Sequence, residues 1–230
     1  MEVRTYGQYC PIARASEIIA MRWTPIIVRN LLLGCETFGE IQDGAPGIPR
    51  TLLSQRLTML TLHGVVERSR GAQDRGWRYR LTAAGEELAA VCDALGAWGA
   101  RWLEVAPPHL DAHVVVWSIC RLAEPEKLPD RRVVIRFDLL DGRHRRLWLL
   151  LSPEAREVCV QPPGFDEDLV VTASAEWLAK WHMGKISLGR AMHEGLIEVE
   201  GPRRLVRSLA TLGLSRFAAV EPARRQSRSA

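Results

Sequence analysis

Hydrophobic and polar positions follow a helical period between Pro49 and Val66. Leu53, Leu57 and Leu60 have the i, i+4, i+7 spacing of a buried stripe. The opposite face is short, polar and uncharged, and it consists of Thr51, Ser54, Gln55 and Thr58. Arg50 and Arg56 flank this face. Such a helix can hydrogen-bond to base edges while its arginines reach phosphates. An ordinary amphipathic surface helix shows the same pattern, so the neighbouring elements decide between the two interpretations.

The preceding pattern predicts three short helices. The first spans residues 10–20, with a proline in its first turn. The second begins with Thr24 as the expected N-cap and ends at Gly34. The third starts with a Thr37-x-x-Glu40 capping box and ends near Gly44.

A basic hairpin follows the helix predicted between Pro49 and Val66, which is the candidate recognition helix. Its strands are residues 65–70 and 77–81, joined by the loop 71–76, and the second strand alternates aromatic or apolar residues with arginines. The arginines expected to contact phosphates or a minor groove are Arg70, Arg75, Arg78 and Arg80. A solvated hairpin face is the plainer alternative. Short helices followed by a basic hairpin are typical of a winged helix-turn-helix domain.

Residues 82–103 are predicted to form one long helix. Its apolar positions recur at spacings of three and four, and they are Leu88, Val91, Leu95, Trp98 and Trp102. Two tryptophans provide more apolar surface than the core of a small winged domain needs. We therefore expect this helix to form a homodimer interface. Packing against the C-terminal half is the alternative.

Charge distribution strengthens the nucleic-acid interpretation. The 230-residue chain has a net charge of only +4, but residues 46–81 contain arginines at 50, 56, 68, 70, 75, 78 and 80 against Glu67 and Asp74. Five scattered cysteines without a C-x-x-C pair predict neither a zinc site nor a disulfide framework. With no signal-like or membrane-spanning apolar run, the sequence predicts a soluble cytoplasmic protein without membrane association.

The segments CPIARASEIIAMRWTPIIVRNLLLG, TFGEI, PGI, LLSQRLTMLTLHGVVER and YRLTAAGEEL resemble the HxlR-type winged helix-turn-helix transcriptional regulators. The resemblance covers roughly residues 8–104, with the motifs in the expected order. It implies a dimer whose N-terminal and last helices form the interface, and recognition helices in successive major grooves of double-stranded DNA.

Two positions are notable in the light of this resemblance. Family members often place Ser or Thr at the start of the recognition helix, where this chain has Pro49. Without a side-chain cap worth about 1 kcal/mol, Arg50 and Thr51 are weaker candidates for DNA contact than Ser54 and Gln55. In some relatives a cysteine at the position of Cys10 senses oxidants or electrophiles; a small apolar residue at the dimer seam is the alternative.

The second half predicts an α+β layer, with a mostly antiparallel sheet covered by helices. A helix at 109–122 precedes strands at 133–139, 145–151, 157–161 and 169–172. Helices at 175–183 and 187–194, a strand at 196–200 and a helix after Pro202 complete the pattern. The predicted domains are residues 1–105, 106–220 and a basic disordered tail, 221–230.

The run VTASAEWLAKWHMGKISLGRAMHEGLIEVEG is similar to sterol-carrier-protein-type lipid-binding domains. The resemblance spans about residues 110–215 and implies an apolar tunnel for a lipid-like small molecule. The candidate lining residues are Phe137, Trp148, Trp177, Trp181, Met183, Ile186 and Met192. The simpler alternative is that they fill an ordinary core.

No catalytic or metal-binding constellation appears, since His182 and His193 do not form an H-E-x-x-H site and no phosphate-binding glycine loop occurs. The sequence therefore predicts a non-enzymatic, cofactor-free, dimeric DNA-binding regulator whose C-terminal domain binds an apolar effector. One alternative is a lipid or acyl carrier that uses the winged domain to dimerise. Another is a thiol redox sensor acting through Cys10.

Overall fold

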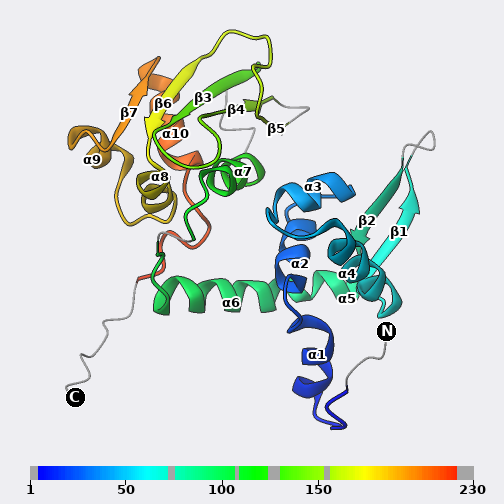
Figure 1. Cartoon of the computed structure of the whole chain (residues 1–230). Helices are drawn as coiled ribbons and strands as arrows, with labels where there is room; N and C mark the ends of the chain where they lie inside the picture. The colour runs from blue at the N-terminus through cyan, green and yellow to red at the C-terminus, as the bar shows by residue number, and fades with distance from the viewer. Residues whose placement is uncertain (1–4, 72–75, 107–108, 124–129, 153–155, 222–230) are drawn as a thin grey trace, which may run out of the picture. The chain divides into compact units, whose positions relative to one another are not determined.

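The computed structural model describes residues 5–71, 76–106, 109–123, 130–152 and 156–221. The chain divides into two compact units, Met1–Leu95 and Gly96–Ala230, with the division inside the helix α6 (Figure 1). The predicted limits of 105 and 220 stay predictions. No described helix has the length and apolar character needed to cross a membrane.

The first unit contains the helices and hairpin that the sequence predicts. Its elements in chain order are α1 (Pro11–Ile19), α2 (Thr24–Leu32), α3 (Phe38–Asp43), α4 (Arg50–Leu62), β1 (Val66–Arg70), β2 (Trp77–Leu81), α5 (Ala83–Glu86) and the start of α6 (Leu88–Trp102). The expected α3 capping box is confirmed: the Thr37 hydroxyl accepts the Glu40 N–H, and the Glu40 carboxylate accepts the Thr37 N–H at 2.9 Å.

Two local expectations in this unit are wrong. Trp23, at φ 77°, is the N-cap of α2, whereas Thr24 lies inside the helix with its hydroxyl buried. The left-handed Trp23 turns the chain sharply between α1 and α2, a role the Thr-Pro signal does not reveal. The predicted single helix over 82–103 is divided at Glu87 into α5 and α6.

The second unit is a mixed sheet covered by helices. The helices are α7 (Ala112–Leu122), α8 (Ala175–His182), α9 (Leu188–His193) and α10 (Arg203–Leu212). The strands are β3 (Val133–Leu139), β4 (Arg146–Leu151), β5 (Arg156–Cys159), β6 (Leu169–Ala173) and β7 (Ile197–Glu200). Their order is β5-β4-β3-β6-β7, and β3 and β6 are parallel whereas the other neighbours are antiparallel, so the mostly antiparallel prediction is confirmed.

One sheet face and the four helices share a single hydrophobic core. Alternate residues of β3, such as Ile135 and Phe137, pack with Ile119 of α7, Trp181 of α8 and Leu209 of α10. The other sheet face is partly polar. This alternation follows from the strand period of two, which sends neighbouring side chains to opposite faces.

Candidate nucleic-acid interface

The helix α4 presents the polar face that its sequence predicts. Leu53, Leu57 and Leu60 are at most 1% exposed, so the predicted apolar stripe is the buried side of the helix. The exposed side chains are Thr51, Ser54, Gln55 and Thr58. Pro49 is the N-cap in an extended conformation and supplies no side-chain hydrogen bond. The first turn therefore lacks a side-chain cap from its N-cap residue.

Hydrogen bonds join α2 to α3, the helix that precedes α4. The buried Asn30 donates from its amide nitrogen to the Ile41 carbonyl at 2.8 Å, and Arg29 donates to the Gly44 carbonyl at 2.6 Å. These bonds join α2 to the middle and end of α3. Burial lowers the pKa of Arg29, although its guanidinium is also held by the Asn30 side chain. The two helices form a fixed support immediately before the α4 turn.

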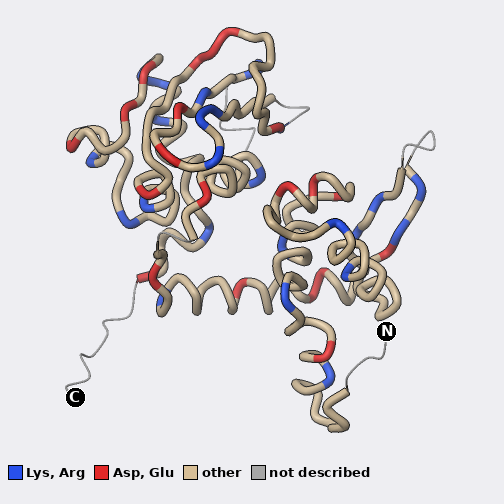
Figure 2. The backbone as a smooth tube through the Cα atoms, viewed as in Figure 1, with Lys and Arg blue, Asp and Glu red and all other residues tan. Residues whose placement is uncertain are grey.

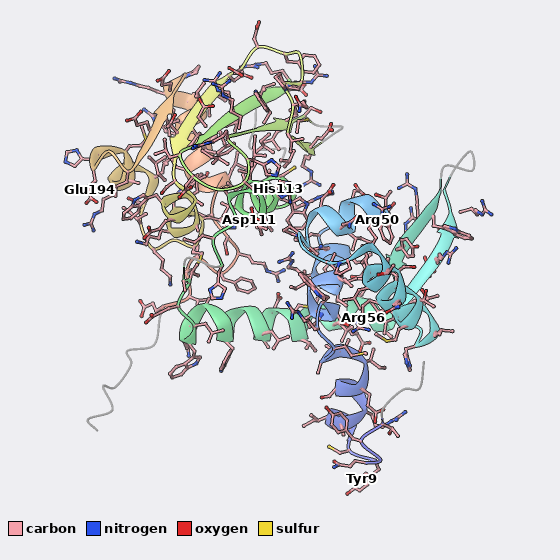
Figure 3. All side chains as sticks on the ribbon, viewed as in Figure 1. Tyr9, Arg50, Arg56, Asp111, His113 and Glu194 are labelled. Atoms are coloured by element: carbon pink, nitrogen blue, oxygen red, sulfur yellow. The ribbon has the colours of Figure 1, made fainter. Side chains whose placement is uncertain are left out.

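The arginines that flank the α4 face are labelled in Figure 3, and both contact other parts of the unit. Arg50 donates to the Gln42 side chain at 3.1 Å, and its guanidinium lies 5.0 Å from the centre of the Phe38 ring. Arg56 donates from Nε to the Arg22 carbonyl at 3.2 Å. Arg50 thus contacts α3, and Arg56 connects α4 to the turn between α1 and α2.

The hairpin β1–β2 is the wing, and Figure 2 marks basic residues along both of its strands in blue. Its antiparallel register places Arg70 opposite Trp77 and Arg68 opposite Tyr79. Tyr79 is 9% exposed, whereas Trp77 is 40% exposed, so this face is covered near the base of the wing and open toward its tip. Arg75 lies outside the described residues.

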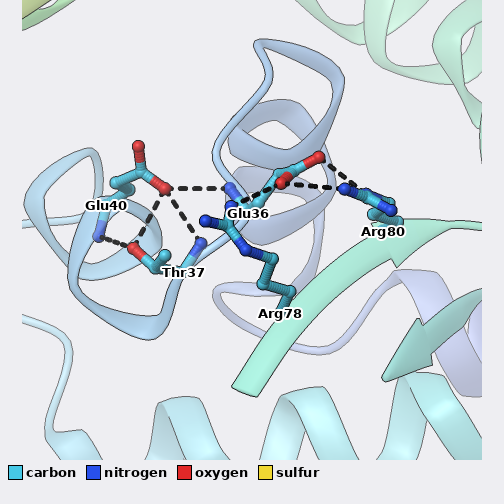
Figure 4. A network of polar contacts seen from close by, with 5 residues as sticks. All are labelled: Glu36, Thr37, Glu40, Arg78 and Arg80. Carbon is cyan, nitrogen blue, oxygen red and sulfur yellow. Dashed lines mark hydrogen bonds and ion pairs between the residues drawn. The ribbon is translucent and has the colours of Figure 1, made fainter. Parts of the chain in front are cut away.

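Glu36 is the main partner of the β2 arginines (Figure 4). Its carboxylate accepts from Arg78 Nη1 at 2.7 Å and from Arg80 Nε at 2.7 Å, with a further bond to Arg80 at 3.3 Å. The Glu36 carbonyl also accepts the Tyr79 N–H at 2.8 Å. Hydrogen bonds from Arg80 are the largest cause that holds the pKa of Glu36 below its usual range, and Glu36 in turn raises the pKa of Arg80.

Two residues of the wing region were missed by sequence reasoning. Glu36 lies outside the basic window of residues 46–81, although it pairs with two of that window's arginines. Arg68 was counted in the window but not selected as a contact, although its guanidinium lies 3.5 Å from the centre of the Trp77 ring. The strand alternation of β1 would have placed Arg68 on the same face as Arg70, and this signal was available in the sequence.

Most of the apolar residues expected at a dimer interface are exposed in this chain, whereas Leu88 is half-buried. On α6, Val91, Leu95, Trp98 and Trp102 are 42–57% exposed. Near α1, Tyr9 is 99% and Ile12 is 77% exposed (Figure 3 labels Tyr9). Cys10 is half-buried at the α1 N-cap, and its carbonyl accepts the Arg14 N–H at 3.0 Å. Its redox role stays a prediction.

The predicted effector-site residues do not all line one space. Phe137 and Trp181 are fully buried in the core, and Trp177, Ile186 and Met192 pack against that core. Trp148 pairs with Arg136, so it lies on the sheet face opposite Phe137, and its indole N–H donates to Glu167 at 2.9 Å. Met183 is half-buried at the end of α8.

A cleft of about 730 Å³ is lined instead by residues of α6 and of the segment after α10, which are Ala97, Trp98, Arg101, Trp102, Ala219, Val220 and Glu221. None of the predicted effector-site residues lines it. Among the described residues, no group of His, Cys, Asp and Glu side chains is arranged to hold a metal ion.

The helices α2, α3 and α4, followed by a two-stranded wing and with an exposed polar face on α4, define a winged helix-turn-helix protein. Residues 18–107 match the model of the HxlR-like helix-turn-helix family. The HTH-type transcriptional regulator YvaP of Bacillus subtilis is 34% identical over 107 residues, which cover 46% of this chain and 97% of YvaP. The chain belongs to the HxlR-like helix-turn-helix family.

Other similar proteins match stretches of similar length. The HTH-type transcriptional regulator Rv3095 of Mycobacterium tuberculosis is 39% identical over 93 residues, which are 40% of this chain and only 58% of that relative's length. The crystal structure of diamide-treated YodB from B. subtilis has 28% identity and a TM-score of 0.35, covering 40% of this chain and 93% of YodB.

Proposed function

We propose that this protein is a DNA-binding transcriptional regulator that acts as a homodimer. The observation that carries the proposal is the exposed face of α4, where Ser54, Gln55 and Thr58 stand above a fully buried leucine stripe. These side chains supply hydrogen-bond donors and acceptors without charge. Such groups suit the base edges of a major groove, whereas the arginines beside them suit phosphates.

Family membership supports the same proposal. YvaP is described as a transcriptional regulator, and 107 residues of this chain account for nearly its whole length. A protein of that size contains little besides the winged helix-turn-helix region. The DNA-binding role is therefore expected to reside in the N-terminal part of this chain.

The proposed dimer would use exposed apolar side chains of α1 and α6. These include Tyr9, Ile12, Leu95, Trp98 and Trp102. Clusters of exposed large apolar residues are typical of interaction surfaces. A two-fold dimer would present two α4 helices to a two-fold symmetric DNA site.

An anisotropy titration of the full chain against a fluorescently labelled duplex of mixed sequence tests the proposal. We expect binding at low salt, with the logarithm of the affinity falling linearly with the logarithm of salt concentration, because phosphate contacts release counterions. Absence of binding at about 50 mM salt, or an affinity that does not change up to about 200 mM, would contradict the proposed function.

An apolar effector for the C-terminal domain is a narrower proposal. Its support is the sequence pattern of the second half, together with the partly buried Trp177, Ile186 and Met192 at the edge of the core. Mass spectrometry of small molecules extracted from the purified protein checks it, because a bound lipid-like compound would be recovered in proportion to protein. Extracts that contain no such compound would count against it.

A further inference from the structure

The register of the hairpin separates its arginines onto two faces. Residues directly opposite each other in an antiparallel pair lie on the same face. Arg68 and Arg70 therefore share a face with Trp77 and Tyr79. The opposite face contains Glu67, Ser69, Arg78 and Arg80. The net charge of the window does not reveal this separation.

The β2 arginines are balanced by acidic side chains. Glu36 makes short bonds to both Arg78 and Arg80, and Glu67 lies opposite Arg80 in the register. Two positive charges are thus accompanied by two negative ones. The backbone of the same segment forms a bridge between Thr37 and Arg78, so these contacts join the wing to the start of α3.

On the other face, both arginines lie against the Trp77 ring. Arg68 lies 3.5 Å and Arg70 lies 4.6 Å from the centre of the Trp77 ring. Arg68 makes no hydrogen bond or ion pair with any residue in the described part of the chain. A guanidinium stacked on an aromatic face keeps its N–H groups at its edge, where they can bind phosphate.

The position of β1 also favours Arg68 over the β2 arginines. The strand packs beside α4, whereas β2 packs beside α2 and α3. A side chain on β1 is therefore attached to the strand nearer to the proposed recognition helix. Arg68 is exposed on this strand, as is Arg70. Contact with the Trp77 ring restricts the orientation of both guanidinium groups.

We propose that Arg68, ordered by stacking on Trp77, is the phosphate-binding residue of the wing, and that Arg78 instead secures the wing to Glu36. This inference rests on the proposed DNA-binding function. One face of the hairpin would then bind DNA, and the other would hold the wing to the rest of the domain. The ligand chemistry is a phosphodiester oxygen of the DNA backbone.

Two matched variants of the full chain test this assignment. Arg68→Gln and Arg78→Gln each remove one positive charge from the same hairpin, and Arg78→Gln leaves Glu36 paired with Arg80. In the mixed-sequence duplex titration, Arg68→Gln should reduce the salt slope by about 0.9 and weaken binding at low salt by about tenfold. Arg78→Gln should keep the wild-type slope. Thermal unfolding of each variant checks that the wing remains folded.

Arg68→Lys provides a rescue, because an ammonium can also bind a phosphate; it should restore the slope that Arg68→Gln loses. An unchanged slope in Arg68→Gln, or an equal or larger loss in Arg78→Gln, would overturn the assignment while DNA binding by the wild type still upheld the proposed function. If the wild type itself shows no salt-dependent binding, both the proposed function and this inference are wrong.

Discussion

At the residue scale, two glycines of the second unit differ sharply in what surrounds them. A Cβ added to Gly213 would overlap the indole ring of the fully buried Trp181, at Cζ2 and Cη2. The φ of Gly213 is −74°, so the backbone itself would accept an alanine. Close packing of the ring, rather than backbone freedom, is therefore the reason for glycine at this position.

We predict that Gly213→Ala lowers the free energy of unfolding by about 1–3 kcal/mol, the usual cost of overpacking a core. Gly189→Ala is the matched control, because nothing lies within 4 Å of its added Cβ. The free energy of unfolding of this control should equal that of the wild type or exceed it by up to about 1 kcal/mol. Urea unfolding followed by circular dichroism measures both, and equal stabilities would contradict the packing argument.

Residue-level prediction from sequence succeeded where the cause is local. The α4 leucine stripe and the Thr37–Glu40 capping box depend on residues three or four positions apart, and both are observed. The Glu36 contacts could not be read in this way, because 42 and 44 residues separate that carboxylate from its two arginines. Only the fold brings these charges together, so a net charge counted over a sequence window overstated the basic surface available to DNA.

At the element scale, α6 presents an apolar stripe that the folded monomer leaves exposed. Leu95 is 50% and Trp98 is 57% exposed. Ala90 is also exposed. It precedes Val91 by one residue, and because each residue turns an α-helix by about 100°, Ala90 lies on a different side of α6 from the stripe. If the stripe forms the dimer interface, a charge at Leu95 would be buried against apolar side chains of the second copy.

We expect Leu95→Glu to convert the dimer to a monomer at micromolar concentration, because burying an unpaired carboxylate costs several kcal/mol. Ala90→Glu introduces the same charge away from the stripe and should leave the dimer intact. Size-exclusion chromatography with light scattering gives the mass of each species. A wild type that is monomeric, or a dimer that persists in Leu95→Glu, would rule out this interface.

Most elements were predictable because their periods are strong. The strands β3 and β4 and the helices α8–α10 lie within a few residues of the expected ranges. The break at Glu87 was not predicted, and the apolar stripe that indicated a helix begins only after it, at Leu88. The Thr-Pro pair predicts Thr24 as the cap, but Thr24 is buried inside α2 and the left-handed Trp23 is the cap.

At the scale of the whole molecule, the two halves differ in how much of their structure and function the sequence predicts. Residues 18–107 match the HxlR-like helix-turn-helix family, and the observed elements of this region follow the predicted order. The C-terminal elements were also placed well, but a ligand tunnel depends on how side chains fill the space between them. Phe137 and Trp148 illustrate the difficulty, because one lies in the core and the other on the opposite sheet face.

The central claim is that α4 reads DNA sequence, and selection from a pool of random duplexes tests it most directly. The full wild-type chain should enrich a two-fold symmetric motif whose half-sites are about 10 base pairs, or a multiple of that spacing, apart. Gln55→Ala should lose preference at one position in each half-site, whereas Ser69→Ala, an exposed change on the wing, should select the wild-type motif. Failure of the wild type to enrich any motif, or an unchanged motif from Gln55→Ala, would contradict the account.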